Sequence, residues 1–472
     1  MGEQELLVRS VNADGDGVAV VDGVPVTLPG TIPGERVSAR LRRARDGSLS
    51  GEVARILVAS PHRVTPRCRH FGQCGGCAWQ HIEYGEQLRI KQGRVQELIG
   101  DRGSKDPRYT EGSIDVLPTL PTPSPDGGTP WGFRNKVSFG FGPGRRGQSA
   151  VMGHYRRGSR TVISVQECPV HADDGNRFAS EVRDALQRAS IPGATADAQQ
   201  GVARHIVVRV SEGTRDLLGT LVVTDNVKAL RRVTADVEAR AAKAVPGARQ
   251  PRLGFHLNVH DSPDPFLFGP ETRRLFGLGE IREQVAGASY LVSPTAFFQT
   301  NVRAAEVLVR VVLDALADRR LHRILDLYSG VGLFAIPLAR AGHIVTAVEE
   351  NREAVASAAA ALRLNRIGMG ACRLVASRVE DAVARLGSVA CDAVVLDPPR
   401  QGCPPRVVDW VFRNIRPARI VYVSCDPEAL ARDLVRVAGT GYHVERVQPI
   451  DMFPHTAHVE TVAVLTRTSS RQ

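Results

Sequence analysis

The chain lacks any long apolar segment, and this absence excludes whole classes of protein. No window of its 472 residues approaches the roughly 18 apolar residues of a membrane-spanning helix. The first ten residues include acidic side chains and no apolar stretch of the kind found in a secretion signal. We therefore expect a cytoplasmic protein with no membrane contact.

Cysteine is scarce, and the way it is spaced excludes a disulfide framework. Eight cysteines are distributed unevenly over a chain without a secretion signal, so metal binding or catalysis is favoured over disulfide pairing. No internal repeat recurs along the chain, which argues against a solenoid. At this length a single hydrophobic core is not expected, and we predict two or three domains.

Lysine is nearly absent as well, and arginine supplies most of the positive charge. The 61 Lys and Arg residues exceed the 50 Asp and Glu residues, which leaves a net charge of +11. Such a charge favours a polyanionic partner, with nucleic acid as the first candidate. Preference for Arg over Lys also follows from the base composition of a genome, so the charge alone leaves both explanations open.

The pattern of strands and helices divides the chain into three expected domains. Residues 1–60 show short strands separated by turn signals, which is typical of a small β-barrel. Residues 61–300 indicate a central α+β domain built on an antiparallel sheet, and its segment 101–130, rich in Pro, Gly, Ser and Asp, indicates a linker or a long exposed loop. In residues 301–472 strands and helices alternate, which predicts an α/β fold with a doubly wound, Rossmann-like parallel sheet.

Three cysteines lie within ten residues at the start of the central domain, next to glycines that let the backbone wrap closely: Cys68, Cys74 and Cys77. This pattern suits an iron–sulfur cluster or zinc. Cys168 is the best candidate for a fourth ligand, because three of the other cysteines fall in the predicted C-terminal domain. Zinc ligands usually come as two close pairs, so the three-plus-one spacing favours a cluster and leaves zinc as the alternative.

A glycine turn follows the first expected strand of the C-terminal domain. Gly330 and Gly332 allow a tight turn and close approach of the backbone to a ligand, and Glu349 ends the next strand, where it can accept hydrogen bonds from ribose hydroxyls. A dinucleotide-binding loop would have a third glycine at the position of Ala335. The pattern instead resembles that of class I S-adenosylmethionine (SAM) methyltransferases.

A stiff loop, Asp397-Pro398-Pro399-Arg400, follows a later strand at the carboxyl end of the same sheet, where open α/β folds bind their ligands. Methyltransferases that act on amino groups typically have an aromatic residue at the fourth position of such a loop. Arg400 fits a phosphate, or a carbonyl that develops negative charge, better than it fits a neutral amine. A rigid turn capped by an aspartate is the alternative interpretation of the motif.

Cys425 lies between an expected strand and an expected helix, with Asp426 as helix N-cap and Pro427 at the first helical position. The positive end of a helix stabilises a thiolate and can lower a thiol pKa from its free value of about 8.5. We therefore expect an activated nucleophile rather than a buried apolar cysteine. Glu460 begins an apolar strand of the same sheet and is placed to act as a general base.

These motifs together resemble the RNA uracil-5-methyltransferase family over nearly the whole chain. The resemblance is greatest to the branch that has an N-terminal, OB-like TRAM barrel and an iron–sulfur cluster and that modifies 23S ribosomal RNA. It implies that Cys425 is the nucleophile and Glu460 the base. It also implies two sets of binding residues, which are Gln299, Tyr328, Glu349 and Asp397 for SAM, and Cys68, Cys74, Cys77 and Cys168 for a [4Fe–4S] cluster.

The resemblance also defines the expected reaction. Cys425 adds to carbon 6 of a uracil that has left its stack, carbon 5 takes the methyl group of SAM, and Glu460 removes the carbon 5 proton. We expect a monomer that acts on 23S ribosomal RNA, with transfer RNA as the alternative substrate and a catalytically inactive RNA-binding or chaperone protein as the alternative function. One position departs from the family pattern, because Leu333 stands where some relatives have an asparagine that contacts the cofactor.

Overall fold

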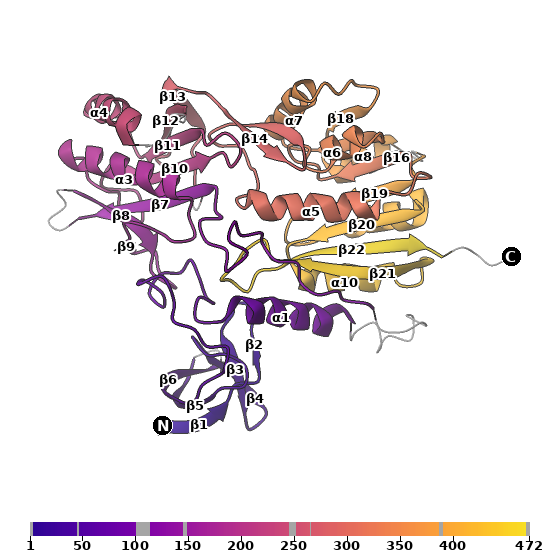
Figure 1. The fold of residues 1–472 in the computed structure, drawn as a ribbon, viewed down its shortest axis with the longest axis horizontal. Coiled ribbons are helices and arrows are strands. Elements are labelled where there is room, and N and C mark those ends of the chain that lie inside the picture. The colour runs from indigo at the N-terminus through magenta and orange to yellow at the C-terminus, as the bar shows by residue number, and fades with distance from the viewer. Residues whose placement is uncertain are drawn as a thin grey trace.

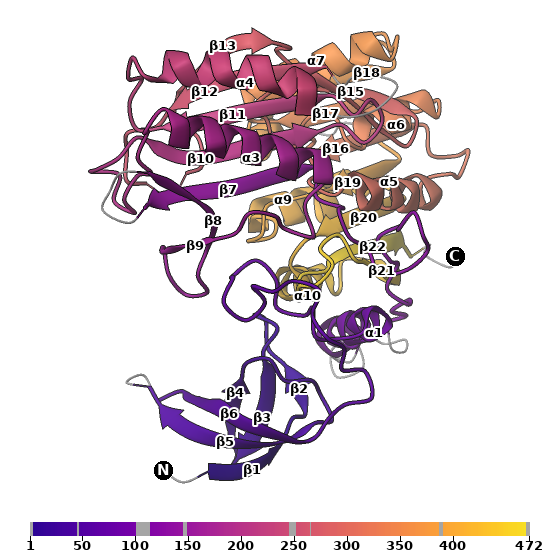
Figure 2. The same ribbon diagram turned by 60° about the vertical axis from the view of Figure 1, so that its left-hand side comes forward.

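The structure is a computed structural model that describes residues 3–44, 47–100, 114–144, 149–244, 252–264, 266–386 and 390–468. Its ribbon has an N-terminal sheet, a central sheet and a C-terminal sheet, with helix α1 between the first and the last of these (Figures 1 and 2). No helix in these ranges combines the length and the apolar character needed to cross a membrane.

The N-terminal sheet is the small barrel-like unit that the sequence predicts. Its six strands follow the order β1-β5-β6-β4-β3-β2. Alternate residues such as Val26, Leu28 and Val37 point inward and are buried in a core of their own, as the two-residue period of a strand requires. The strands are β1 (Glu3–Leu7), β2 (Ser10–Val11), β3 (Gly17–Val21), β4 (Val24–Leu28), β5 (Arg36–Arg43) and β6 (Leu49–Val58).

Helix α1 (Tyr84–Val95) and the π-helical turn η1 (Gln96–Gly100) connect the barrel to the rest of the chain. The expected linker 101–130 begins with residues outside the described ranges. Its later part is not an exposed loop, because Val116 and Leu120 pair with the edge strand of the C-terminal sheet and the Val116 side chain is buried. Prolines in this segment prevent continuous strand pairing, but isolated bridges still form.

The central sheet has the order β13-β12-β11-β10-β7-β8-β9. All neighbouring strands are antiparallel except β11 and β12, so the expectation of an antiparallel sheet was wrong for this pair. Helix α4 (Leu230–Ala244) connects these two strands as a crossover, which makes them parallel. The strands are β7 (Lys136–Pro143), β8 (Ala150–Tyr155), β9 (Val162–Ser164), β10 (Ala203–Val210), β11 (Leu217–Val223), β12 (Leu253–Val259) and β13 (Glu271–Gly277). Helices α3 (Asp173–Arg188) and α4 cover one face of the sheet (Figure 1).

The C-terminal sheet confirms the prediction of a doubly wound fold. Beyond its parallel strands it has two more, β22 and β21, which join by antiparallel pairing. Its order is β18-β17-β16-β19-β20-β22-β21, in which the first five strands are parallel and β22 runs against both neighbours. The strands are β16 (Arg323–Leu327), β17 (Ile344–Glu349), β18 (Cys372–Ala376), β19 (Ala393–Leu396), β20 (Arg419–Ser424), β21 (Tyr442–Ile450) and β22 (Glu460–Arg467).

Helices bury both faces of this sheet, as parallel sheets require. The helices that pack on one face are α5 (Val302–Ala315), α6 (Ala335–Arg340) and α7 (Arg352–Leu364). The opposite face is covered by α8 (Val379–Leu386), α9 (Pro405–Asp409) with the π-helical turn η3 (Trp410–Ile415), and α10 (Pro427–Val437), together with η1.

A two-stranded hairpin, β14 (Ile281–Val285) and β15 (Ala288–Val292), precedes α5. Its residues Ile281, Val285 and Tyr290 are buried in the same hydrophobic core as α5 and the C-terminal sheet. The hairpin therefore packs with the C-terminal sheet, although it lies before residue 301, where we expected that domain to begin. The three-domain division itself remains a prediction.

Candidate functional site

Cys425 and Glu460 lie at the carboxyl end of the C-terminal sheet, on adjacent strands. Strands β20 and β22 pair antiparallel up to Ser424 opposite Thr461, so Cys425 directly follows β20 where Glu460 begins β22, and the Glu460 carboxyl is close enough to act on the Cys425 thiol. The Thr461 hydroxyl donates to the Ser424 carbonyl at 2.9 Å, which ties the two strand ends together. Strand pairing therefore brings the expected nucleophile and the expected base into one pocket.

The local structure around Cys425 follows the sequence closely. Asp426 is the N-cap of α10, and its carboxylate accepts hydrogen bonds from the backbone N–H groups of Glu428 and Ala429 at 3.0 and 3.3 Å. Pro427 occupies the first turn of the helix, where a missing N–H costs nothing. Cys425 itself is half-buried.

The electrostatic expectation for Cys425 was wrong. We expected the helix terminus to lower the pKa of the thiol, but burial and the nearby Glu460 carboxyl raise it to about 11, with a further contribution from Asp397. The guanidinium of Arg400 lies beside the thiol and acts in the opposite direction, and burial outweighs it. At neutral pH the ligand-free protein therefore carries a protonated thiol.

Several carboxyl groups gather around this pocket and raise one another's pKa. Burial, with Asp397 as the nearest negative charge, raises the pKa of Glu460 to about 8. Burial and Glu349 raise the pKa of Asp397 to about 7. Both carboxyls thus retain protons at a pH where they would be ionised in water.

Asp326, inside strand β16, is a member of this acidic cluster that sequence reasoning did not single out. It is fully buried, and the Ala335 backbone N–H is the one described donor that favours its charged form, without the geometry of a regular hydrogen bond. Burial, Asp397 and Glu349 raise its pKa well above the ordinary value. The available signal was an aspartate within the apolar run Ile324 to Leu327. A buried acidic cluster without a cation fits a positively charged ligand, such as SAM with its sulfonium and ammonium groups.

The glycine turn beside this cluster is held in a shape that few residues can adopt. Tyr328, Gly330 and Gly332 have φ angles of 64°, 55° and 84°, in the left-handed region. Glu349 fixes the turn, because its carboxylate accepts hydrogen bonds from the Gly330 N–H at 2.9 Å and the Asn351 N–H at 2.8 Å. A non-glycine residue at positive φ is strained, and such strain is often found at binding sites.

The structure does not bring every expected cofactor residue into this cluster. Gln299 is half-buried in the loop between β15 and α5, and no hydrogen bond within the described part of the chain joins its side chain to the acidic cluster. Its cofactor contact stays a prediction. The Leu333 side chain is buried in the hydrophobic core instead.

The Asp397-Pro398-Pro399-Arg400 loop is supported from behind by a buried polar network. Asp433 accepts hydrogen bonds from the Cys403 N–H at 2.8 Å and from the Tyr422 hydroxyl at 2.7 Å. Gly402 has a φ of 82°, and a side chain there would collide with the Asp433 carboxylate. This network holds the loop that carries Asp397 and Arg400 against strand β20.

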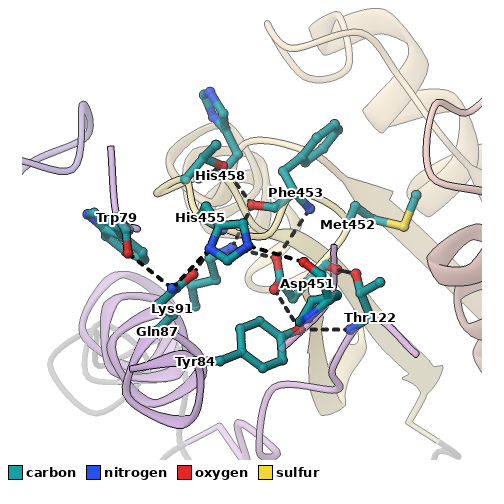
Figure 3. Close-up of polar contacts among 12 residues, drawn as sticks. Trp79, Tyr84, Gln87, Lys91, Thr122, Asp451, Met452, Phe453, His455 and His458 are labelled. Atoms are coloured by element: carbon teal, nitrogen blue, oxygen red, sulfur yellow. Dashed lines mark hydrogen bonds and ion pairs between the residues drawn. The ribbon is translucent and has the colours of Figure 1, made fainter. Parts of the chain in front are cut away.

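The segment before Glu460 is anchored to α1 by a buried ion pair. The Lys91 ammonium group donates to Asp451 Oδ1 at 2.5 Å and to the Phe453 carbonyl at 3.1 Å, and both charged side chains are fully buried. The Tyr84 hydroxyl donates to the second carboxylate oxygen of Asp451 at 2.9 Å. Figure 3 shows these side chains of α1 pointing at the segment Asp451 to His458.

His455, in the same segment, contacts both the loop before the central sheet and the end of the cysteine loop. Its ring stacks on Trp131 at a centroid distance of 4.1 Å and hydrogen-bonds to the Pro130 carbonyl at 3.1 Å. Its backbone carbonyl accepts hydrogen bonds from the N–H groups of Ala78 and Trp79, at the end of the cysteine loop. The residue is therefore structural, and burial lowers its pKa to about 4.

The four cysteines expected to bind a metal group line one cavity of about 130 Å³ between the cysteine loop and the central sheet: Cys68, Cys74, Cys77 and Cys168. The Gly76 N–H donates to Cys74 Sγ at 3.4 Å, and the Cys168 backbone is held by two hydrogen bonds with Asn176. Burial and the other three cysteines raise the pKa of Cys168 to about 12. Sulfurs that converge in this way fit a bound metal group, which stabilises thiolates.

The cavity is lined by other side chains besides the four cysteines. Two histidines that sequence reasoning missed, His154 and His171, also line the cavity, and each has a ligand nitrogen within 4.8 Å of Cys168 Sγ. They come from separate elements, so no local spacing could reveal them.

Comparisons with known proteins agree with this arrangement. A family model described as tRNA (Uracil-5-)-methyltransferase matches residues 281–468, and a TRAM domain model matches residues 2–54. A protein of Gloeobacter violaceus named an uncharacterized RNA methyltransferase is 35% identical over 98% of this chain and 95% of its own length. One of Thermosynechococcus vestitus with the same description is 34% identical over 98% of this chain and 97% of its own.

A solved structure resembles the whole molecule. It is the Pyrococcus abyssi tRNA (uracil-54, C5)-methyltransferase in complex with S-adenosyl-L-homocysteine. The two chains superpose with a TM-score of 0.75 and 26% sequence identity, over 98% of this chain and 99% of that chain. The two proteins therefore share their overall fold.

Removal of the buried lysine tests the anchoring of the segment before Glu460. Lys91→Met leaves the Asp451 carboxylate buried without a counter-charge, which costs about 3–5 kcal/mol. Hydrogen exchange of residues 447–460 should then accelerate by a factor on the order of one hundred or more. Arg413→Met, which removes the exposed pair with Asp409, is the matched control and should change exchange little. Unchanged protection of 447–460 in Lys91→Met would show that the ion pair does not anchor the segment.

The acidic cluster predicts how stability depends on pH. Because the folded pKa values of Glu460 and Asp397 lie at about 8 and 7, above the ordinary 4.5 and 3.8, the folded protein holds protons that the unfolded chain has released. Their contribution to stability is present at low pH and is lost as pH rises from about 4 to about 8. In the ligand-free protein, thermal unfolding of Glu460→Gln should therefore lose less stability over this range than the wild type. Parallel curves for the two proteins would contradict the assignment.

Proposed function

The chain belongs to the SAM-dependent RNA uracil-5-methyltransferase family, and from that membership we propose that it methylates carbon 5 of a uridine in RNA through a covalent adduct at Cys425. The observation that carries this proposal is the proximity of Cys425, at the end of β20, to Glu460, at the start of β22, next to a buried acidic cluster that fits a cationic cofactor.

The chemistry of uracil explains why two side chains are needed. Carbon 5 is too weak a nucleophile to take a methyl group unaided. The Cys425 thiolate adds to carbon 6, which forms a carbon–sulfur bond and moves the electrons of the double bond into an enolate. SAM supplies an electrophilic methyl group, which carbon 5 attacks. The Glu460 carboxylate then removes the carbon 5 proton, the carbon–sulfur bond breaks and the thiolate is released.

The electrostatics of the pocket fit this sequence of steps. A base with a pKa of about 8 is well matched to proton removal near neutral pH. Arg400 lies beside Cys425, where its charge favours the thiolate and can stabilise an enolate oxygen. A cation held by Asp326, Glu349 and Asp397 would offset the negative charges that raise the thiol pKa, so cofactor binding and thiol ionisation are coupled.

The RNA class is the second part of the proposal. We propose 23S ribosomal RNA, because the barrel and the four-cysteine set resemble the branch of the family that modifies it. Transfer RNA is the second candidate, because the Pyrococcus abyssi relative is named for a uridine in transfer RNA. Mapping of 5-methyluridine in both RNA classes from a deletion strain separates the two.

The cysteine cavity is proposed to hold a [4Fe–4S] cluster through Cys68, Cys74, Cys77 and Cys168. Neither Cys425 nor Glu460 lines this cavity, so the cluster would link parts of the chain rather than take part in the reaction. The cluster would join the cysteine loop to the loop after β9 that contains Cys168. Its role would be structural.

Substitution of the nucleophile and substitution of the base should block different steps of the reaction. Cys425→Ala should abolish methyl transfer and keep SAM binding. Glu460→Gln should form the adduct and methylate carbon 5 but release product slowly, since the carbon 5 proton has no acceptor. Mass spectrometry of the Glu460→Gln protein after incubation with SAM and RNA should show a protein–RNA conjugate that Cys425→Ala lacks. Methyl transfer by Cys425→Ala near the wild-type rate would exclude the covalent mechanism.

The metal content of the anaerobically purified protein tests the cluster. We expect a brown protein with broad visible absorption that bleaches on oxidation, together with about four iron atoms per chain. Cys168→Ser should lose most of the iron, whereas Cys391→Ser, in the C-terminal domain, should keep it. A colourless protein with one zinc per chain would assign the site to zinc.

A further inference from the structure

The two faces of the central sheet differ sharply in what covers them. Along β7, Val137, Phe139 and Phe141 are buried in the core beneath α3 and α4. The alternate residues Ser138, Gly140 and Gly142 belong to the opposite face, because successive side chains of a strand point to opposite sides. Two of these three positions have no side chain, so the opposite face is hollow there.

This hollow is a groove of about 730 Å³. One wall comes from β8, β9 and their connection, with Tyr155, Arg160 and Val162. The other parts of its lining include Arg204 and His205 of β10. A Cβ atom on Gly140 would lie 3.5 Å from the Tyr155 ring, so side chains larger than glycine would begin to fill the floor.

Aromatic rings stand exposed at the groove. Tyr155 and Phe266 keep 43% and 71% of their surface exposed, and both lie at the same groove. The Tyr155 ring packs edge-on against His205 at a centroid distance of 6.2 Å, so its orientation is fixed by a neighbour. Such rings on an open sheet are a platform on which nucleic-acid bases can stack.

The charge of the groove is complementary to phosphate. Arg160 and Arg204 line it against a single acidic residue, Asp264. Arg204 is held in place by hydrogen bonds to the carbonyls of His260 and Ser262, both at 2.6 Å. Arg160 is exposed and forms no ion pair with any described carboxylate, so its guanidinium group is available. Together with the net charge of +11, this arrangement favours a polyanion over a neutral ligand.

We propose that this groove binds a single-stranded segment of the RNA substrate, away from the uridine that is methylated. Bases of the segment stack on Tyr155 and Phe266, and Arg160 contacts its backbone. The inference rests on the proposed function for the identity of the RNA. It adds a second binding site on the central domain to the catalytic pocket of the C-terminal sheet.

The cysteine loop supports one wall of the groove. The Gly75 N–H donates to the Tyr155 carbonyl at 3.1 Å, and the Arg157 N–H donates to the Gln73 carbonyl at 2.9 Å. The Arg157 guanidinium group also donates to both carboxylate oxygens of Asp16, in the N-terminal barrel, at 2.7 Å. The connection between β8 and the edge strand β9 is thus fixed by the cysteine loop and by the N-terminal barrel (Figure 2). A metal group held in the cysteine cavity would therefore stabilise the groove as well as the loop.

The proposal is tested with the full chain and a short fluorescein-labelled single-stranded RNA of mixed sequence. Loss of one stacked base costs about 1–3 kcal/mol, so the Tyr155→Ala/Phe266→Ala double variant should bind this RNA at least tenfold more weakly. Binding of S-adenosyl-L-homocysteine should not change. Met369→Ala removes a side chain that is 85% exposed elsewhere and is the matched control. Tyr155→Phe retains the ring and should bind RNA like the wild type.

Arg160→Gln gives an independent readout, because removal of one phosphate contact lowers the salt dependence of RNA binding by about one unit of slope. Photo-crosslinking with RNA that contains 4-thiouridine should label peptides that include Tyr155 or Phe266.

Unchanged RNA binding by the double variant, or crosslinks confined to other surfaces, would overturn the proposal and leave the face to a protein or a small ligand. These assays measure binding alone. If the wild type binds RNA through the groove but transfers no methyl group, the proposed function is wrong and the proposed binding site is correct.

Discussion

The buried ion pair between Lys91 and Asp451 is the constraint on which the active-site arrangement depends. Two charges without solvent contact are costly to desolvate, and each is tolerated only because the other lies 2.5 Å away. Burial lowers the pKa of Lys91 and the neighbouring Asp451 raises it, so the pair acts as one unit. Since Lys91 comes from α1 and Asp451 from the end of β21, the pair fixes the N-terminal part of the chain to the C-terminal sheet. Nine residues after Asp451 the chain reaches Glu460.

This anchoring explains how a base and a nucleophile from distant parts of the sequence meet. Glu460 begins β22, and its position is set on one side by pairing with Ile450 of β21 and on the other by the register with β20. Cys425 follows β20 directly. The geometry of the pocket is therefore determined by backbone pairing, while its electrostatics are determined by burial and by the carboxyls that surround it. In the ligand-free protein the pKa values of both reactive groups are raised, to about 11 for Cys425 and about 8 for Glu460, and a bound cation would lower them.

Much of the fold could be predicted from the sequence because its elements carry strong local signals. The short strands of the barrel, the alternation of strands and helices in the C-terminal domain and the start of α10 after its N-cap Asp426 were predicted and are observed. Strands β8 and β13 were missed, since β8 contains Gly153 and β13 is an exposed edge strand with the charged run Glu271 to Arg274. The parallel pair β11 and β12 was not predicted, although the helix between the two strands is the crossover that parallel neighbours need.

The residues of the site could be predicted from the sequence, but their pKa values could not. Cys425, Glu460 and the four cysteines were identified from motifs and family resemblance, and the structure brings each set together. The raised thiol pKa could not be foreseen, because a helix terminus is visible in the sequence whereas burial and the approach of Glu460 are not. Asp326, His154 and His171 were missed for the same reason, since their roles arise from tertiary neighbours.

Proton loss from carbon 5 is the step that distinguishes this account most directly from any other RNA methylation. It can be measured as release of tritium into water from RNA labelled with tritium at carbon 5 of uridine, prepared from a strain that lacks the protein. The account predicts that one tritium is released for each methyl group transferred. Methyl transfer with full retention of tritium would place the methyl group on another atom and contradict the central claim.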